Sequence, residues 1–430
     1  MRQLTLAAAL VITAMGSSAA SRDVHAQIDQ QAQQTLPAVI GWRRDFHAHP
    51  ELSNHEERTS ALVAEELRRI GLDEVRTGLA KHGVIGILKG GRPGKVVALR
   101  ADMDALPVTE ATGLPYASTV RSTYQGRDVG VMHACGHDSH TAMLLGVANV
   151  LAGIRRDLPG TVMFIFQPAE EGAEDRTRPW GAEGMLLDGA FRGPKPDAVF
   201  GLHVMPATAG TLGWHKGGTT ASADTLHIKV RGVQTHGAMP WMGKDPVTVA
   251  AEIVVALQTI PSRQMNVSRA PTIVSIGQIH AGVRSNVIPG EVNMEGTIRV
   301  LDPSQREDFL ERITRLARLT AEASGLEAEV VIDRGYGVTY NDPALVDRMV
   351  PSLQRVGHAE ETPATMASED FSYFAQQVPG FFFTLGVNPA GTDPARAPAN
   401  HSPEFTVNED ALITGVRAMA SVAADYLMQP

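Results

Sequence analysis

Side chains that can bind metal are concentrated in the nine residues Met132–His140, written MHACGHDSH. Cys135 and His137 stand two positions apart with Gly136 between them, and a glycine lets a loop turn a thiolate and an imidazole onto one ion. Alone, each of these residues is more typical of a buried cysteine or a capping histidine. Five candidates in nine residues favour a metal site, placed directly before a helix that is expected to begin near Thr141.

A pair of acidic residues, Glu170 and Glu171, follows the apolar run that ends at Phe166, in the sequence QPAEEG. Open α/β sheets bind their ligands at the carboxyl ends of strands, where this pair would lie. Adjacent side chains usually point in different directions, so one carboxylate can bind a cation while the other handles a proton. The alternative is a solvated acidic turn.

Two further histidines, His203 and His401, come after apolar runs at 198–202 and 381–385. Each is ordinary by itself, but the predicted strand ends would bring them to one edge of a sheet. The pattern is typical of a two-metal hydrolytic site. Its expected ligands are Cys135, His137, Glu171, His203 and His401.

Two aspartates, Asp102 and Asp104, end another apolar run in the sequence RADMDALP. They can ligate a metal directly, or they can hydrogen-bond a ligand histidine and orient its ring. We favour the second role for both.

The elements that must position these side chains are short apolar strands alternating with helices. Helical periodicity runs over 40–71, with Gly71 as its stop, and a further helix is expected over 142–154. Strands that are apolar along their whole length are buried on both faces. The predicted fold class is therefore α/β, with a buried mixed sheet in the catalytic domain. The runs that predict strands are 83–88, 96–101, 162–166, 198–202 and 381–385.

The region 218–334 has a different pattern, with strands that alternate polar and apolar residues. Its predicted order is β-α-β-β-α-β, the ferredoxin-like arrangement. We therefore expect a small α+β domain inserted into the catalytic domain. The predicted boundaries are 1–26 for a signal peptide, 27–217 and 335–430 for the catalytic domain, and 218–334 for the insertion.

Composition and the N-terminus limit the possible partners and the compartment. The formal net charge is −9, from 38 Lys and Arg against 47 Asp and Glu, which argues against binding nucleic acid. Arg2, an apolar run over 4–15 and small residues before Ala20 or Ala26 are typical of a secretory signal peptide. We expect a secreted, periplasmic protein with no membrane span after cleavage; an ordinary N-terminal helix is the alternative.

Seven motifs together resemble one family. In chain order they are RADMDALP, MHACGHDSH, QPAEEG, GLHV, THGAMP, SNVIPG and NHSPEF. From Trp42 to the C-terminus the chain is similar to the hippurate hydrolase and N-acyl-amino-acid amidohydrolase branch of the dinuclear metallopeptidases. Relatives of that branch are aminoacylase, carboxypeptidase G and the indole-acetyl-amino-acid hydrolases.

The resemblance implies the same five ligands for two divalent ions, zinc or manganese, with Glu170 as general base. Wider relatives carry His-x-Asp where this chain has Asp102 and Asp104, and an aspartate in place of the bridging Cys135. In both places the chain follows the amidohydrolase branch.

The resemblance also implies roles for the inserted domain. His236 would hold the substrate carbonyl oxygen, Asn286 would contact the substrate, and the domain would form a homodimer. Arg299 and Arg334 are further candidates, because a guanidinium can bind a substrate carboxylate with two hydrogen bonds.

The expected reaction is hydrolysis of N-acyl amino acids such as hippurate to a carboxylic acid and a free amino acid, by metal-activated water. An exported dipeptidase or carboxypeptidase with the same metals is the nearest alternative, and a non-catalytic metal-binding or ligand-binding protein is a more distant one. A cysteine nucleophile fits the spacing of Cys135 and His137 less well than shared ligation.

Overall fold

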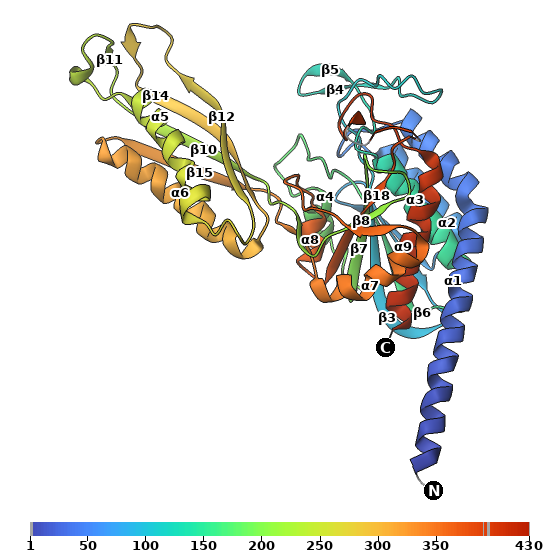
Figure 1. Cartoon of the computed structure of the whole chain (residues 1–430). Coiled ribbons are helices and arrows are strands. Elements are labelled where there is room, and N and C mark those ends of the chain that lie inside the picture. The colour runs from blue at the N-terminus through green and yellow to red at the C-terminus, as the bar shows by residue number, and fades with distance from the viewer. Residues whose placement is uncertain (1–2, 390, 394–395, 430) are drawn as a thin grey trace. The chain divides into compact units, whose positions relative to one another are not determined.

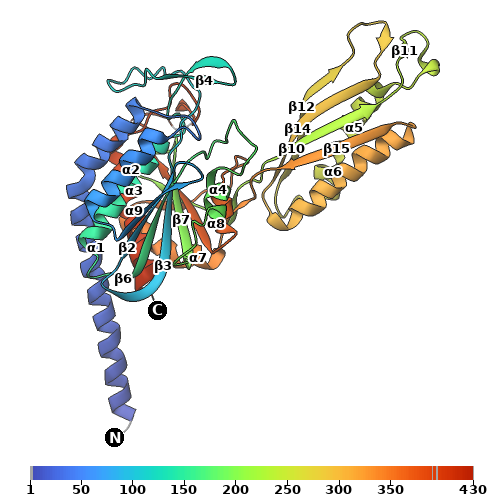
Figure 2. The ribbon, with the colours of Figure 1, turned by 180° about the vertical axis from the view of Figure 1, so that it is seen from behind.

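The computed structural model describes residues 3–389, 391–393 and 396–429, which form two compact units (Figures 1 and 2). The smaller unit comprises Gly217–Tyr340 and Pro363–Tyr373, and the rest of the chain belongs to the larger unit. The segment Pro363–Tyr373 differs from the predicted boundaries, which left it in the catalytic domain. It joins the smaller unit because the Thr365 N–H donates to the Thr219 carbonyl at 3.0 Å.

The larger unit is built around an eight-stranded mixed sheet in the described part of the chain, which confirms the predicted α/β class. Its strands, in spatial order, are β1 (Glu74–Leu79), β2 (Gly83–Lys89), β6 (Pro159–Gln167), β3 (Arg92–Asp102), β7 (Ala198–Met205), β18 (Gly380–Gly386), β8 (Leu212–Trp214) and β17 (Ala359–Glu361). A separate hairpin pairs β4 (Arg121–Tyr124) with β5 (Arg127–Gly130).

The neighbours β6, β3, β7 and β18 run parallel, so their carboxyl ends meet at one edge of the sheet. Their central residues are fully buried, including Leu99, Phe164, Phe200 and Phe383. The near-continuous apolar runs in the sequence thus correspond to strands covered on both faces.

Helices cover this sheet. α3 and α9 pack on β3 and β7, and α1 lies across α3 and α9 (Figure 1). The helices of the larger unit are α1 (Gln3–Ala48), α2 (Glu57–Ile70), α3 (His137–Gly153), α4 (Gly181–Leu187), α7 (Pro343–Val356), α8 (Phe371–Ala375, shared with the smaller unit), η4 (Glu409–Ala411) and α9 (Leu412–Met428).

Two predicted helices differ from the structure. The helical pattern over 40–71 is divided between α1 and α2, because Pro50 disfavours helical backbone in the residue before it. Gly71 ends α2 in the left-handed conformation, as predicted, with φ 87°. The helix expected near Thr141 begins four residues earlier, at His137. Part of the metal-binding motif is therefore helical.

The segment predicted to be a signal peptide falls on the N-terminal helix. Its helix α1 is continuous from Gln3, and its side chains are described from Val24 onward. Val24 and Ile28 are buried in the core, and His25 Nε2 lies 2.6 Å from Asp425 Oδ1 in α9. The folded larger unit therefore uses residues close to the two predicted cleavage points.

One helical stretch among the described residues, Glu409–Met428, is long and apolar enough to cross a membrane by length and composition. Its most apolar window is 72% buried within the protein, as in the core helix of a globular domain.

The smaller unit, all of whose residues are described, has the predicted β-α-β-β-α-β order, and its antiparallel sheet runs β12-β14-β10-β15. Helices α5 and α6 contribute to the hydrophobic core of this unit. The elements are β9 (Gly217–Thr220), β10 (Asp224–Arg231), β11 (Thr235–His236), η1 (Pro240–Met242), α5 (Pro246–Leu257), η2 (Ile260–Gln264), β12 (Thr272–Ala281), β13 (Val287–Ile288), β14 (Glu291–Val300), α6 (Pro303–Ala323), β15 (Glu327–Arg334) and β16 (Thr339–Asn341).

Candidate active site

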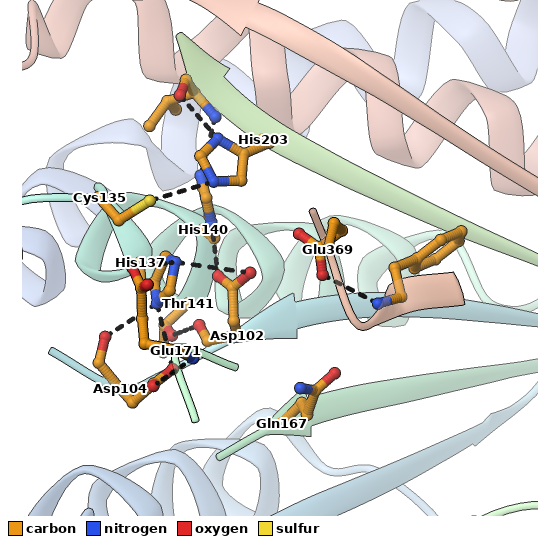
Figure 3. Close-up of polar contacts among 12 residues, drawn as sticks. Asp102, Asp104, Cys135, His137, His140, Thr141, Gln167, Glu171, His203 and Glu369 are labelled. Carbon is orange, nitrogen blue, oxygen red and sulfur yellow. Dashed lines mark hydrogen bonds and ion pairs between the residues drawn. The ribbon is translucent and has the colours of Figure 1, made fainter. Parts of the chain in front are cut away.

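The predicted metal-binding residues lie at the carboxyl edge of the large sheet, and Figure 3 labels four of them, Cys135, His137, Glu171 and His203. His203 lies in β7, Glu171 follows β6, and Cys135 precedes α3. His401 arrives on the chain that follows β18. These positions are far apart in the sequence, and the parallel strands bring them together.

The turn at Gly136 sets the Cys135 and His137 side chains. Gly136 has φ 92°, a left-handed conformation that favours glycine. A Cβ atom there would lie 2.3 Å from Cγ2 of Val204. Only glycine fits this turn without movement of its neighbours, and the turn leads directly into the first residue of α3.

Two histidines turn Nε2 toward the cluster because Nδ1 of each ring donates to a backbone carbonyl. His137 Nδ1 lies 2.9 Å from the Asp104 carbonyl, and its buried Nε2 has no hydrogen-bond partner among the described residues. His203 Nδ1 lies 2.8 Å from the Val204 carbonyl, while Nε2 lies 3.4 Å from Cys135 Sγ. Metal-binding histidines have this arrangement.

Glu171 and His401 form the other side of the cluster. His401 Nε2 lies 3.2 Å from Glu171 Oε1. The His401 backbone has φ 70°, and its N–H donates to the Ala134 carbonyl at 2.8 Å. Asn400 adds a bond from Nδ2 to the Cys135 carbonyl at 3.0 Å. The His401 segment is thus tied to the loop that carries Cys135.

The five predicted ligands form two overlapping groups, with the donor atoms of each group within 4.8 Å of one another. One group is Cys135, His137 and His203, and the other is Cys135, Glu171 and His401. Sulfur, imidazole and carboxylate donors suit zinc and similar divalent ions. The buried His137 Nε2, which has no hydrogen-bond partner among the described residues, gives such an ion a place to bind. The arrangement fits two ions that share Cys135.

Burial and hydrogen bonds shift the pKa of three of the candidate ligands. Burial lowers the pKa of His203 well below its ordinary value, which keeps the imidazole neutral as a ligand must be. Burial raises the pKa of the Cys135 thiol. Hydrogen bonds to Cys135 and Glu171 raise the pKa of His401 to about 10. The Cys135 sulfur and the Glu171 carboxylate thus favour a positive charge at the position of the His401 ring.

The two predicted helper aspartates have different partners. Asp104 accepts from the ligand candidate His137, with Oδ1 3.2 Å from Nδ1. Asp102 instead binds Arg100 Nη1 at 2.7 Å and His140 Nδ1 at 2.5 Å. Its nearest oxygen is 3.8 Å from His137 Nε2. Only Asp104 therefore makes the predicted hydrogen bond to a ligand candidate.

His140 belongs to the metal-binding motif by sequence but not by its hydrogen bonds. Its Nε2 accepts from the Val204 N–H at 2.8 Å, so Nδ1 carries the proton donated to Asp102. Both ring nitrogens are therefore occupied. The spacing of the motif does not distinguish His140 from Cys135 and His137, whose donor atoms face the cluster.

Glu170 lies beside the donor cluster and is buried, with 7% exposure. One of its oxygens lies within 4.8 Å of donor atoms of His137 and Glu171. The preceding Ala169 has φ 53°, an uncommon conformation for alanine. The chain thus directs a second carboxylate toward the cluster.

The smaller unit brings His236 and Asn286 together at its tip, defined here as Thr235–Met242 with Asn286–Ile288. β11 pairs with β13, and the Gly237 N–H donates to the Asn286 carbonyl at 2.8 Å. His236 is exposed, and its Nδ1 accepts from the Ala238 N–H at 3.0 Å. In the neutral ring the proton is therefore on Nε2, available for donation.

The two predicted substrate arginines have different environments. Arg334 makes a bidentate ion pair with Glu307, at 2.5 and 2.6 Å, which occupies its guanidinium. Arg299 is half-buried, burial lowers its pKa, and it makes no ion pair with a described residue. In this structure the guanidinium of Arg334 is thus paired with a carboxylate of its own chain, whereas Arg299 has no such partner among the described residues.

Comparisons with known proteins give a consistent result. A family model described as peptidase family M20/M25/M40 matches residues 98–425. Thermostable carboxypeptidase 1 of Saccharolobus solfataricus is 38% identical over 391 residues, covering 90% of this chain and 95% of the relative. N-acyl-L-amino acid amidohydrolase of Geobacillus stearothermophilus is 40% identical over 324 residues, covering 74% and 83%. A Bacillus subtilis structure described as a dinuclear metal binding peptidase has a TM-score of 0.77 and 33% identity, covering 92% of this chain and 99% of that one.

Proposed function

The chain belongs to peptidase family M20/M25/M40, and from this premise we propose that it cleaves the amide bond of N-acyl amino acids. Membership confirms the resemblance carried by the motifs and makes the protein a hydrolase. The products would be a carboxylic acid and a free amino acid. The observation that carries the proposal is the pair of donor groups sharing Cys135, with Glu170 beside them.

The proposed cofactor is a pair of divalent ions, zinc or manganese, held by the five donors of the two groups. Such ions lower the pKa of a bound water from about 15.7 to about 7, which makes hydroxide available at neutral pH. Cys135 would serve both positions, and Asp104 would keep the His137 ring oriented through Nδ1.

The chain's own groups would move the protons. Glu170 takes a proton from the attacking water and later donates it to the departing amine, as a general base and then a general acid. His236, with its proton on Nε2, donates a hydrogen bond to the developing oxyanion. Asn286, beside it at the tip, contacts the substrate.

The test is a substrate panel with a matched variant. Purified protein loaded with Mn²⁺ or Zn²⁺ is assayed for amine release from N-benzoyl, N-acetyl and indole-acetyl amino acids and from free dipeptides. Glu170→Gln should bind both ions but lose turnover by about 10³-fold or more. Loss of metal in Glu170→Gln would mean that Glu170 is a ligand and that the two carboxylates have been assigned the wrong roles.

A second candidate is a carboxypeptidase acting at the same site, favoured by the 38% identity to a protein named carboxypeptidase. The same panel separates the two, because a peptidase would prefer free dipeptides to N-acyl amino acids. If protein that carries two ions cleaves neither class of substrate, the remaining hypothesis is a non-catalytic binding protein.

We also propose a homodimer through the smaller unit. β12 is an edge strand, and an edge presents unpaired backbone groups to another chain. The adjacent α5 exposes Val247, Ala251 and Val255 along one stripe, with Val255 70% exposed. Light scattering should report a dimer, and Val255→Lys should shift it toward monomer.

We also propose that the protein is exported and that its signal peptide is cleaved after Ala20. Cleavage after Ala26 would remove the buried Val24 and the His25 contact with Asp425, whereas cleavage after Ala20 keeps both. Mass spectrometry of the N-terminus of protein recovered from the periplasm tests both the compartment and the site.

A further inference from the structure

Glu56 has a side chain whose position its own helix does not explain. It stands at the N-cap of α2 but makes no side-chain capping bond there. Its carboxyl group is fully buried and contacts the loop after β6. Oε1 accepts from the Ala169 N–H at 2.9 Å and from the Asn54 N–H at 3.0 Å. The acid therefore joins two loops that are distant in the sequence.

Both donors to Glu56 have left-handed backbones. Asn54 has φ 62° and Ala169 has φ 53°, two of the few non-glycine residues with positive φ in the described chain. Asparagine tolerates this conformation because its side chain can bond locally, whereas alanine has no such group. A buried N–H also needs an acceptor. The conformation of Ala169 thus depends on a bond supplied from elsewhere.

Ala169 directly precedes Glu170, so its backbone angles set where the Glu170 carboxylate points. The chain is held on either side as well. Arg100 Nε donates to Gln167 Oε1 at 2.8 Å, and the Glu171 N–H donates to Asp104 Oδ2 at 3.0 Å. The bonds to Glu56 and Asp104 thus fix the two residues that flank Glu170, and the bond to Glu56 fixes the one with the left-handed backbone.

We propose that Glu56 is a positioning residue that holds Ala169 in the left-handed conformation and so aims Glu170 at the donor cluster. The inference rests on the proposed role of Glu170 as general base. Glu56 would act through hydrogen bonds accepted by one oxygen, not through a charge. In agreement, burial and the neighbouring Asp104 raise the pKa of Glu56 well above its usual range, which keeps the acid neutral.

The experiment compares two substitutions at one position. Glu56→Gln keeps an acceptor oxygen of the same reach, and Glu56→Ala removes it. With metal loaded, kcat should stay within about threefold of the wild type for Glu56→Gln and fall about 100-fold for Glu56→Ala, the scale expected for a misplacement of about 1 Å. KM and metal content should change little in both. Glu57→Ala, at the exposed neighbour, is the control and should behave like the wild type.

A coupled variant tests the route through Ala169. Glycine adopts positive φ readily, so Ala169→Gly should reduce the loss caused by Glu56→Ala, and the two changes should not be additive. Additive losses would overturn the proposed route. Retention of kcat in Glu56→Ala, or equal damage in Glu56→Gln, would overturn the proposal itself. If Glu56→Ala does not fold, Glu56→Asp replaces it, because aspartate is one methylene shorter.

Hydrogen exchange separates this proposal from the proposed function. Exchange of the segment around Ala169, followed by mass spectrometry, should be faster than wild type in Glu56→Ala and unchanged in Glu56→Gln. This readout needs no substrate. Absence of N-acyl hydrolysis in the wild type would defeat the proposed function while leaving the exchange result to decide the role of Glu56.

Discussion

The donor cluster of the larger unit and the tip of the smaller unit hold reactive side chains in opposite ways. In the cluster, Cys135 and His137 are buried, and the bonds of His137 Nδ1 and His203 Nδ1 to backbone carbonyls direct Nε2 of these two rings toward the other donors. At the tip, His236 is exposed, and Trp241 and Met242 beside it are 75% and 68% exposed. Donors for a cation gain from rigid and dry surroundings, whereas groups that meet a substrate must be open before it binds.

The strongest way to test this contrast is to remove the shared donor. Cys135→Ser should reduce the metal content from two ions per subunit to less than one and lower kcat by more than about 10³-fold, because both donor groups depend on this sulfur. Elemental analysis and steady-state kinetics measure the two effects. His133→Gln, in the same motif but outside both groups, is the control. Retention of two ions in Cys135→Ser would show that the sulfur is not shared.

Removing the exposed histidine should affect catalysis alone. His236→Ala should lower kcat by about 10²-fold to 10³-fold, the usual loss for one oxyanion donor. Metal content and melting temperature should stay at wild-type values, because the side chain packs in no core. His227→Ala, an exposed histidine on the sheet of the same unit, is the control. A melting temperature that falls with activity would contradict the open-tip interpretation.

The buried ion pairs of His47 with Asp138 and Glu110 predict a pH effect on stability. His47 lies between Asp138, 2.8 Å from Nδ1, and Glu110, 3.1 Å from Nε2. Burial lowers the pKa of His47, but the two carboxylates raise it by more than burial lowers it. The pKa of His47 in the folded protein is therefore above its ordinary value of 6.5. The folded state therefore holds this proton more tightly than the unfolded state does. Its stabilisation is complete below pH 6.5 and is lost as the pH rises through the raised pKa.

His47→Gln should flatten the pH dependence of the free energy of unfolding over that interval. Urea unfolding at several pH values, for the variant and the wild type, measures the slope. Equal slopes would mean that His47 is neutral in the folded protein and that its two carboxylates do not act on it as described.

The smallest effect is expected at Arg334. Its pair with Glu307 is exposed, so Arg334→Gln should cost about 0–1 kcal/mol of stability and leave KM within about twofold. Kinetics with an N-acyl amino acid measure this. A tenfold rise in KM would return Arg334 to the substrate site, as the sequence had suggested.

Much of the site could be predicted because residues that can bind metal stand close to the predicted ends of strands in the sequence. Apolar runs marked β3, β6, β7 and β18, and candidate donors stood at or after the predicted ends of strands or before a helix. Hydrogen-bond partners could not be predicted in the same way. His137 and His140 look alike in the motif, and contacts with residues distant in the sequence distinguish them. His137 Nδ1 lies 2.9 Å from the Asp104 carbonyl, and Nε2 of that ring has no hydrogen-bond partner among the described residues. His140 Nε2 is occupied, because it accepts from the Val204 N–H at 2.8 Å.

The sequence by itself determined the fold class and the inserted α+β order, and it predicted the candidate donor residues. These follow from periodicity and residue type, which are local properties of the chain. Tertiary structure alone decided that Asp102 serves Arg100 and His140, that Arg334 is taken by Glu307, and that Glu56 contacts the residue before Glu170. Those outcomes depend on which polar groups meet when distant segments are buried together, because a buried polar group must find a partner wherever the fold places one.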